Sequence, residues 1–508
     1  MSNRDTTAAR RYHDGTKHSV TRLRAHPHYL DWDIKPLPFK IYPHIEAIPL
    51  PRQLPPSRVP ALTAIAGGAA AASAVPDAEM LARILHFSAG ITRKKTYPGG
   101  QEHYFRAAAC TGALYHIDVY AICGDLPGVP AGVYHFGPHD FALYRLRAGD
   151  QRGVLVEATG SEPSVAHAPV ILVCASTYWR NAWKYQARAY RHCFWDTGTI
   201  LANLLAVTAA AAVPSRVVCG FVDDTVTALL GLDPQREGPL ALVALGEDPT
   251  VVAPQAPVSA IAAETLPLSS REVDYPAIRE MQAASSLRTA EEVRAWREGV
   301  ASPVRQSAAP EQVTPLRPLD DAALPGETID SVVLRRGSTR QFAHVPITFE
   351  QLSTLLRSGT RGVSADYAAS PTDVYLIVNA VEGLAPGTYV YERATDSLEL
   401  LRSGSFRREA GHLGLGQDLP ADASVNIYML CNLDPLLARF GNRGYRVAQL
   451  DAAIIGGKLY LAAYALRLGA TGLTFFDDDV TEFFSPHAAG KSVMFLMAVG
   501  RGRKTGHV

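Results

Sequence analysis

The sequence has little that would place the protein outside a cell or in a membrane. Its six cysteines are scattered and form no C-x-x-C pair, which argues against a disulfide framework or a zinc site. The segment Met1–Arg24 is polar and has no apolar signal core. The longest apolar run, Ile200–Val213, is too short for a bilayer span and contains Asn203 and Thr208. We therefore expect a cytoplasmic protein with no membrane partner.

An excess of either charge is also missing. The 508 residues include 49 basic and 49 acidic side chains, so nothing global favours binding to nucleic acid. Hydrophobic residues make up 47% of the chain, which excludes a largely disordered protein. The length is sufficient for more than one domain with a substantial core.

The second half of the chain repeats the first half at a constant offset. Asp118-Val119-Tyr120 returns as Asp373-Val374-Tyr375, 255 positions later, and Gly220–Asp224 aligns with Phe475–Asp479 at the same offset. The repeat predicts a duplicated domain, with an internal pseudo-twofold axis in place of a homodimer axis. We expect an extended N-terminal arm over residues 1–60, a first domain over 61–250, a connection over 251–328 and a second domain over 329–508.

Within each copy, apolar runs alternate between strand and helix lengths. This pattern predicts an α+β fold in which a central, mostly antiparallel sheet is flanked by helices. A stretch rich in alanine and glycine, Ala61–Ala74, is expected to be mobile. The expected strands are Ile117–Cys123, Val170–Cys174 and Leu240–Leu245, and the expected helices are Ala78–Ala89 ended by Gly90, Thr199–Ala212 and Thr289–Glu298.

The stretch Leu334–Phe342 holds three arginines and two hydroxyl side chains. Arginine presents a planar fork of donors that matches phosphate oxygens, and hydroxyl groups add short donors. A helix follows, with Thr348 as its expected cap. The pattern predicts an anion cradle that precedes a helix, with a solvated basic loop as the alternative.

Each copy lacks what the other keeps. The turn Cys110–Ala113 has a register partner within Gly362–Pro371, where the small Thr-Gly-Ala sequence is lost. The basic stretch has its counterpart near Gly67–Ala72, which contains no basic residue. One composite site between the two copies explains this better than two equivalent sites.

These segments resemble the nitroreductase-type flavoproteins, in particular the SagB-type dehydrogenase or thiazoline oxidase branch in tandem form. Arg335–Phe342 is similar to the family's Arg-Arg-Ser-x-Arg-x-Phe phosphate motif, and Cys110–His116 is similar to its Ser-Ala-Gly-Ala-Leu-Tyr-Pro segment. Trp183–Arg191 is similar to its Trp-Lys-Tyr-x-x-Arg-Ala-Tyr-Arg segment, and the arm motifs Thr16–Ser19 and His28–Trp32 fit the same branch.

The resemblance implies FMN as the cofactor, bound across the seam between the copies. It departs from the family pattern at Cys110, where serine is usual, and at His116, where proline is usual. The implied phosphate ligands are Arg335, Arg336, Ser338 and Arg340, with Arg501 or Arg503 closing the cradle. The residues implied to line the flavin ring are Cys110, Thr111, Gly112 and Ala113, with Gly472 and Leu473 at its edge.

Lys184 and Tyr185 match the pair that azoline-oxidising members of the family use to remove a proton while the flavin takes a hydride. A lysine can act as this base if burial or a neighbouring cation lowers its pKa. The alternative is a basic amphipathic turn with a packed tyrosine. In the second copy the register partners are Arg439 and Phe440, which indicates a single working site.

Several other motifs are assigned structural roles, and no metal site is expected. The acidic runs Asp223-Asp224 and Asp477–Asp479, and likewise Asp196 and Asp451, are interpreted as helix caps. His26-Pro27-His28 has no ligand partner at metal spacing and is assigned to the packed arm. Cys110 is interpreted as a small filler beside the flavin rather than a reactive thiol.

The expected function is that of an FMN-dependent dehydrogenase or oxidase. Its expected substrate is a small molecule or a modified peptide that carries an azoline or a similar C–N or C–C bond, as in RiPP-type biosynthesis. A cyclodehydratase or another biosynthetic protein would be the partner. The alternatives are an NAD(P)H-dependent reductase of nitro compounds or quinones, and a non-catalytic scaffold subunit of a peptide-modifying complex.

Overall fold

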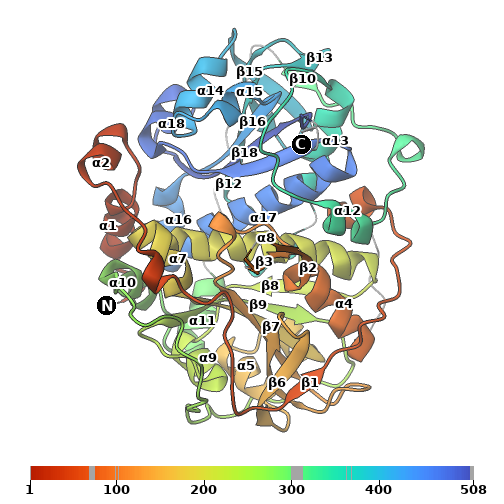
Figure 1. Ribbon diagram of the computed structural model, residues 1–508, viewed down its shortest axis with the longest axis vertical. Helices are drawn as coiled ribbons and strands as arrows, with labels where there is room; N and C mark the ends of the chain where they lie inside the picture. Colours follow the sequence, from red (N-terminus) through yellow and green to blue (C-terminus); the bar gives the residue numbers. More distant parts are fainter. Residues whose placement is uncertain are drawn as a thin grey trace.

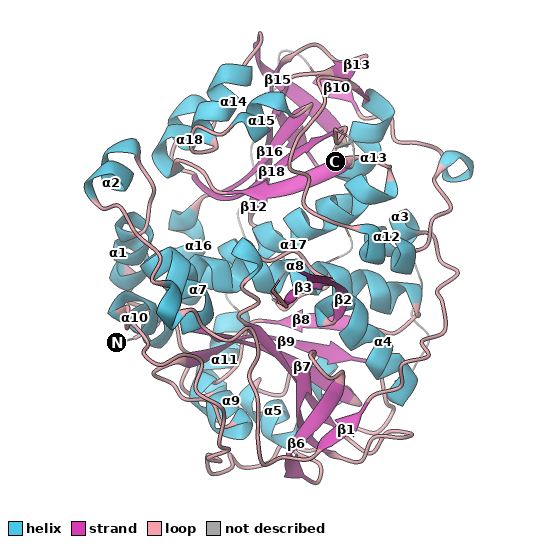
Figure 2. Ribbon diagram, viewed as in Figure 1, coloured by secondary structure: helices cyan, strands magenta, loops and turns pink. Residues whose placement is uncertain are grey.

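The computed structural model describes residues 2–67, 75–97, 99–100, 102–298, 313–361, 363–367 and 369–503. Two seven-stranded sheets occupy opposite ends of the molecule, with helices between them and around them (Figure 1). Figure 2 shows helices and strands mixed in both halves, as expected for an α+β protein. The predicted fold class is therefore confirmed.

The two sheets have the same strand order. All pairings within them are antiparallel. The first sheet contains, in spatial order, β1 (Ala47–Pro49), β6 (Ala142–Ala148), β5 (Gly132–Gly137), β4 (Ile117–Cys123), β7 (Val170–Thr177), β9 (Glu237–Leu245) and β8 (Ser215–Val218). The second contains β10 (Val313–Pro315), β15 (Ser397–Ser403), β14 (Gly387–Glu392), β12 (Thr372–Val378), β16 (Val425–Cys431), β18 (Ser492–Gly500) and β17 (Gly469–Leu473).

The helices repeat in the same way. In the first half they are α3 (Ala61–Ala66), α4 (Ala78–Ala89), α5 (Arg152–Ala158), α6 (Pro163–Ala166), α7 (Tyr178–Tyr185), α8 (Ala189–Ala210) and α9 (Asp223–Leu230). Their counterparts are α12 (Ile329–Arg335), α13 (Phe349–Gly359), α14 (Arg407–Leu413), α15 (Asp418–Asp422), α16 (Leu433–Phe440), α17 (Arg443–Ala465) and α18 (Asp477–Phe483).

The long helices α8 and α17 form the centre of the seam between the halves (Figure 1). A methyl group added to Gly198 would lie 2.5 Å from Cβ of Ala453, and one added to Gly457 would lie 2.6 Å from Cβ of Ala202. These reciprocal contacts let the two backbones approach closely around the pseudo-twofold axis. The joined stretch Tyr178–Ala210 has the length and hydropathy of a membrane span, but 89% of its apolar window is buried in the protein, as in a core helix.

Most expected elements are present, and one is longer than expected. The helix Ala78–Ala89 and the strand Ile117–Cys123 have the predicted bounds, and Thr289 caps α11 (Ala290–Arg297). Helix α8 begins ten residues before the expected start at Thr199, because its first turns mix polar side chains such as Arg191 and His192 with apolar ones, and the continuous apolar run begins only at Ile200. Of the stretch expected to be mobile, Ala61–Ala66 is helical, and residues 68–74 lie outside the described residues.

The N-terminal arm is less extended than expected. It contains α1 (Thr7–Gly15), α2 (Val20–Ala25) and a short 3-10 turn, η1 (Trp32–Ile34). Proline first appears at position 27, so nothing prevents helix formation before it. Strands β1 and β10 also lie within the ranges expected to be arm and connection, and each forms the edge of a sheet.

The remaining elements belong to connections. A separate hairpin of β2 (Ile91–Thr96) and β3 (Glu102–Arg106) belongs to the first half, and the described residues of the second half contain no counterpart of it. The second half has the small parallel pair β11 (Ile347–Thr348) and β13 (Val381–Glu382). The other short elements are η2 (Thr111–Ala113), η3 (Gln186–Arg188), α10 (Pro276–Ala284) and η4 (Asp321–Ala323).

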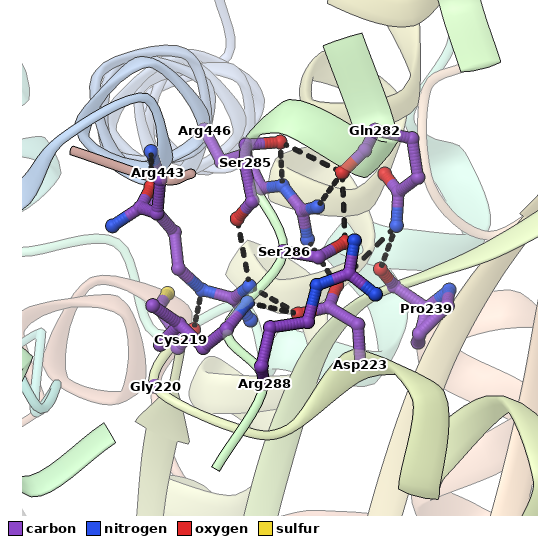
Figure 3. A network of polar contacts seen from close by, with 12 residues as sticks. Cys219, Gly220, Asp223, Pro239, Gln282, Ser285, Ser286, Arg288, Arg443 and Arg446 are labelled. Atoms are coloured by element: carbon purple, nitrogen blue, oxygen red, sulfur yellow. Dashed lines mark hydrogen bonds and ion pairs between the residues drawn. The ribbon is translucent and has the colours of Figure 1, made fainter. Parts of the chain in front are cut away.

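Two reciprocal clusters of buried charges tie the halves together. Figure 3 shows the first, in which Arg443 and Arg446 of α17 converge on Asp223 at the start of α9. Their Nη1 atoms lie 2.5 and 2.7 Å from the carboxylate oxygens. The same carboxylate accepts a hydrogen bond of 3.1 Å from the backbone nitrogen of Leu287, so it also fixes the connection between the two domains.

The second cluster mirrors the first. Arg188 and Arg191, from the first half, lie 3.0 and 2.6 Å from the carboxylate of Asp477 at the start of α18. Asp223 and Asp477 were predicted to cap their helices, but neither helix has a side-chain cap. That prediction is wrong because both carboxylates are buried and turned toward arginines of the opposite half. These two structurally equivalent aspartates lie 254 positions apart, one fewer than the offset of 255 found elsewhere in the repeat.

Candidate functional site

A cavity of about 710 Å³ lies at the seam. Its walls come from the β2–β3 hairpin, the turn after it, α7, α8, the basic turn after α12, and β17. The predicted site residues that line it are Cys110, Thr111, Gly112, Ala113, Lys184, Tyr185, Arg336, Ser338, Arg340, Gly472 and Leu473. Segments more than 200 positions apart in the sequence thus meet around one space, as the composite-site argument predicts.

Three predicted phosphate ligands do not line this cavity. Arg335 is the last residue of α12 and pairs with Glu327 at 2.6 Å. The Nε of Arg501 donates to the carbonyl of Pro346 at 3.2 Å, and Arg503 is exposed beyond the last strand. Successive residues at the end of a helix point in different directions, so Arg336 faces the cavity while Arg335 faces away.

Arg336 joins the basic turn to the first half. Its Nε donates to the carbonyl of Ala107 at 3.1 Å, and its Nη2 donates to the carbonyl of Arg106 at 3.2 Å. Ser338 accepts a hydrogen bond of 2.7 Å from the hydroxyl of Tyr460, which leaves its own hydroxyl hydrogen able to donate. Arg340 is exposed at the rim of the cavity. The turn therefore offers charged and neutral donors to an anion.

The basic turn follows a helix rather than opening one. It begins where α12 ends, whereas α13 starts later, at Phe349, behind a capping box formed by Thr348 and Gln351. The predicted cap is thus confirmed, but α13 does not line the cavity. A helix C-terminus carries the negative end of the macrodipole. Attraction for an anion must therefore come from the side chains of the turn and not from a helix N-terminus.

Asp196 fixes the small turn of the first half. It accepts hydrogen bonds from Sγ of Cys110 at 3.0 Å and from the nitrogen and hydroxyl of Thr111 at 2.9 and 2.7 Å. His116, in place of the family's proline, reaches the same carboxylate through Nε2 at 2.9 Å. Asp196 was predicted to be a cap, but it lies inside α8, which begins at Ala189. Its role is to anchor the turn.

Burial and the neighbouring Asp196 carboxylate raise the pKa of the Cys110 thiol well above its usual value. The thiol therefore stays protonated at neutral pH and donates to Asp196. A neutral thiol is a poor nucleophile. This favours the interpretation of Cys110 as a packed donor over that of a reactive cysteine.

In the second half, the corresponding carboxylate anchors the segment around the start of β12. Asp451, also predicted to be a cap, lies inside α17. It accepts hydrogen bonds from the hydroxyls of Tyr367, Ser370 and Thr372 at 3.2, 2.5 and 2.6 Å. The local chain that precedes β12 is therefore anchored as the turn is in the first half, but with different side chains.

At the pseudosymmetric counterpart of the cavity, side chains of the described residues contact the backbone after β8. Cys219 and Gly220 follow β8 where Thr474 and its neighbours follow β17. Their backbone nitrogens donate to the carboxylate of Asp366 at 2.9 and 2.7 Å. The indole of Trp296 lies directly over Gly220, 2.8 Å from where a Cβ would be. The backbone groups that could face a ligand here already have partners.

Tyr185 ends α7 beside the small turn. A Cβ at Gly112 would lie 2.8 Å from the Tyr185 hydroxyl, and Gly112 has a φ of +64°, so only glycine suits this position. The Tyr185 ring meets His192 edge-on, with centroids 4.5 Å apart. Burial, Asp196 and Cys110 raise the pKa of Tyr185. The phenol therefore stays protonated and can donate a hydrogen bond.

Lys184 is half-buried and lines the same end of the cavity. Its Nζ lies 5.4 Å from the centre of the Tyr185 ring. The register partners Arg439 and Phe440 end α16 at the equivalent place, so this lysine–tyrosine pair exists at one of the two pseudosymmetric positions.

The cavity also has lining residues that the sequence arguments did not select. His18 comes from the arm, and its backbone nitrogen donates to Asp477 at 2.8 Å. Burial and the nearby Arg188 lower the pKa of His18 to about 3, so its ring is neutral. The motif Thr16–Ser19 was noted only as part of the arm, because no spacing rule links His18 to Asp477, which lies 459 positions later. Other lining residues of this kind include Thr92, Arg93, His103, Phe105, Arg106, His192, Trp195, Gln417, Tyr460, Thr474 and Phe495.

No group of metal-ligating side chains able to hold an ion occurs among the described residues. His28 instead packs on α7, where its Nε2 lies 3.0 Å from the carbonyl of Trp183.

Comparison with known proteins places this geometry in a family. A nitroreductase-like protein of Methanocaldococcus jannaschii is 25% identical over 182 residues, which are 34% of this chain and 90% of that protein. The microcin B17-processing protein McbC of Escherichia coli is 25% identical over 159 residues, 30% of this chain and 54% of McbC, so the match spans about half of that relative. The solved structure of a nitroreductase-like protein of Anabaena variabilis superimposes with a TM-score of 0.76 and 25% identity, over 98% of this chain and 99% of its own.

The sequence pattern of the nitroreductase family matches the chain twice, at residues 71–247 and 333–501. These two segments make up more than half of the sequence and coincide with the two halves of the pseudo-dimer. The chain therefore belongs to the nitroreductase family, with one domain of that family in each half.

Proposed function

We propose that the protein is an FMN-dependent dehydrogenase or oxidase that acts on an azoline, or a similar C–N or C–C bond, in a peptide-derived substrate. The observation that carries the proposal is the meeting of three features at one cavity. These are the basic turn with Arg336, the small turn at Cys110–Ala113, and the pair Lys184–Tyr185.

The residues present fit FMN. Arg336, Ser338 and Arg340 supply charged and neutral donors at one end of the cavity, which suits a phosphate. The turn anchored by Asp196 offers a wall of small residues, which leaves room for a ring system. A volume of about 710 Å³ also falls within the usual range of cofactor and ligand pockets.

When bound, FMN would supply the capacity to accept a hydride. The chain itself must then move a proton. Lys184 is the residue we assign to accept this proton, because it lines the cavity and its Nζ lies beside the Tyr185 ring. Tyr185 keeps its proton and is suited to orient the substrate as a hydrogen-bond donor.

Support for this substrate class comes from the likeness to McbC, which is named for microcin B17 processing. A modified peptide would then be the substrate, and a biosynthetic enzyme that forms the heterocycle would be a natural partner. The other relative is named as a nitroreductase, so reduction of nitro compounds or quinones with NAD(P)H is the second candidate.

The test uses the Lys184→Ala variant with a synthetic neutral peptide that contains one thiazoline. We expect the variant to keep its flavin and lose oxidation, measured by mass spectrometry as the loss of two hydrogen atoms. Lys35→Ala, at an exposed lysine outside the cavity, is the matched control and should behave as wild type. Turnover by the Lys184 variant would refute the base assignment. Rapid anaerobic bleaching of the wild-type flavin by NADPH, without thiazoline oxidation, would favour the reductase.

A further inference from the structure

A histidine that the proposed reaction does not use faces the cavity. His192 belongs to α8 and lines the cavity, although only 2% of the residue is exposed. The Nδ1 atom of its ring lies 2.8 Å from Oδ1 of Asn181 on α7. An amide oxygen only accepts hydrogen bonds, so Nδ1 carries the hydrogen and Nε2 presents a lone pair.

The Nε2 atom of His192 is accessible from the cavity. It has no hydrogen-bond partner among the described residues, and the fully enclosed polar atoms without a partner do not include it. Burial and the nearby Arg188 lower the pKa of the ring well below its usual value, so the imidazole is neutral and Nε2 acts as an acceptor. A buried acceptor is costly unless water or a ligand donates to it.

Two aromatic side chains hold the His192 ring in place. The Tyr185 ring meets it edge-on with centroids 4.5 Å apart, and the Trp195 ring lies 4.8 Å away at an interplanar angle of 36°. The Trp195 indole is itself fixed, because its Nε1 donates to Oε1 of Gln449 at 2.6 Å. The direction of the Nε2 lone pair is therefore set before a ligand binds, which lowers the cost of ordering the site.

The second half shows what packing alone requires at this place. Asn181, Tyr185 and His192 each have an apolar, buried residue at the equivalent position of α16 or α17. These partners, 255 positions later, are Leu436, Phe440 and Val447. A group that only packed α7 against α8 would be served by apolar side chains, as it is there. The polar group occurs where α7 and α8 line the cavity, which indicates that it serves the site.

An acceptor at Nε2 of His192 complements the donors around it. Tyr185 keeps its proton and donates, and Lys184 offers further donors in its charged form. Asp196 is the one carboxylate among the described residues that line the cavity, and it is already engaged by the small turn. A ligand that brings both a carbonyl and an N–H fits this end of the cavity, and the peptide backbone brings both at each residue boundary.

We infer that His192 positions the substrate by accepting, at Nε2, a hydrogen bond from a backbone N–H beside the bond that is oxidised. This inference rests on the proposed function, since it adds a residue that determines specificity to the same site. The enzyme should discriminate against a substrate in which an ester oxygen replaces that N–H. The replacement places an oxygen lone pair against Nε2, and a site built for a hydrogen bond rejects the analogue that lacks it.

The test measures the binding of two neutral probes that are already oxidised and therefore do not turn over. These are the N-methylamide and the methyl ester of one thiazole carboxylic acid, which have nearly the same shape but differ in the N–H. Isothermal titration calorimetry on the protein, kept saturated with FMN, gives both Kd values. The amide should bind at least about five-fold more tightly than the ester.

Two variants of His192 and one control assign the preference to Nε2. His192→Met keeps a side chain of similar length without a strong acceptor and should remove most of the difference between the probes. His192→Gln returns an amide oxygen near the position of Nε2 and should retain part of it. His28→Met is the matched control, because His28 also contacts α7 through a ring nitrogen but does not line the cavity. It should leave the difference unchanged.

The comparison on the wild-type protein needs no variant, so it decides the inference even if a His192 variant fails to fold. Equal binding of the two probes, or no binding of either, would overturn it. An unchanged preference in His192→Met would also overturn it and place the acceptor elsewhere. The Kd for FMN is measured beside these values. A rise of more than about ten-fold in His192→Met, with the probe preference unchanged, would assign Nε2 to the flavin instead.

The outcomes separate this inference from the proposed reaction. If the amide is preferred as expected while the neutral thiazoline peptide is not oxidised, the proposed reaction fails and the acceptor remains. If the peptide is oxidised while the two probes bind equally, the reaction stands and His192 has no part in positioning the substrate.

Discussion

Removal of the two inward donors of the basic turn should release FMN. The double variant Arg336→Ala, Ser338→Ala deletes one guanidinium and one hydroxyl that face the cavity. A hydrogen bond from a charged donor contributes about 1.5–3 kcal/mol, and a neutral one contributes about 0.5–1.5 kcal/mol. If the two effects add, the loss is about 2–4.5 kcal/mol, which raises the Kd for FMN by about 30- to 2,000-fold.

The assay compares the Kd for FMN, measured by fluorescence quenching, with the flavin retained after gel filtration. Arg335→Ala is the matched control, because Arg335 is adjacent in sequence, pairs with Glu327 and does not line the cavity. It should keep the wild-type Kd. Arg336 also donates to two carbonyls of the other half, so the thermal midpoint of each apoprotein is measured to separate seam loosening from lost phosphate contacts.

Two results would refute the assignment of the cradle. The first is a double variant whose Kd for FMN stays within about three-fold of wild type, which corresponds to less than about 1 kcal/mol. The second is an equal loss of FMN in Arg335→Ala, which would place the phosphate on the outer side of the turn.

Three further predictions follow from the same contacts. The protein should bind a single FMN per chain, because Asp366 and its neighbours fill the second pseudosymmetric position; two FMN by absorbance and protein mass would contradict this. Gly112→Ala and Gly149→Ala both place alanine at positive φ, so each should lose about 1–2 kcal/mol of unfolding free energy in urea. Gly112→Ala alone should also lose thiazoline oxidation, since its Cβ would meet the Tyr185 hydroxyl; equal activity of the two variants would argue against that contact. Burial lowers the pKa of Lys458 from 10.5 to about 7, so above pH 7 the folded chain has released a proton that the unfolded chain still holds. Stability should therefore rise with pH relative to Lys458→Met, by up to about 1.4 kcal/mol per pH unit between about pH 7 and pH 10, and a flat difference between urea unfolding at pH 7 and pH 9 would contradict the shift.

Local signals in the sequence predicted the elements and the repeat well. Apolar runs and end signals located α4 and β4 to the residue, and the hydroxyl before α13 was identified as its cap. The repeat offset predicted that two halves would face each other, because corresponding apolar runs had to form corresponding cores. These features depend on residues that are close together in the chain, or on comparison of the chain with itself.

Features that depend on partners far apart in the chain were not predictable. Asp477 resembles a helix cap in sequence, but its partners Arg188 and Arg191 lie more than 280 positions earlier. Likewise, the motif alone did not distinguish Arg335 from Arg336, because the choice depends on where α12 ends and which side of it faces the seam. The β2–β3 hairpin had no sequence signal that linked it to the site, since nothing local indicates that its residues line the cavity.

The two walls of the cavity are separated by a long interval during synthesis. The turn at residues 110–113 is made about 220 residues before the basic turn that begins at Arg336, an interval of about 10–45 s at a translation rate of about 5–20 residues per second. The first half must therefore leave the ribosome with the seam face of α8 uncovered. Under the proposed function, a chain truncated at the domain boundary would lack the basic turn and could not hold FMN, so cofactor loading would report that translation was completed.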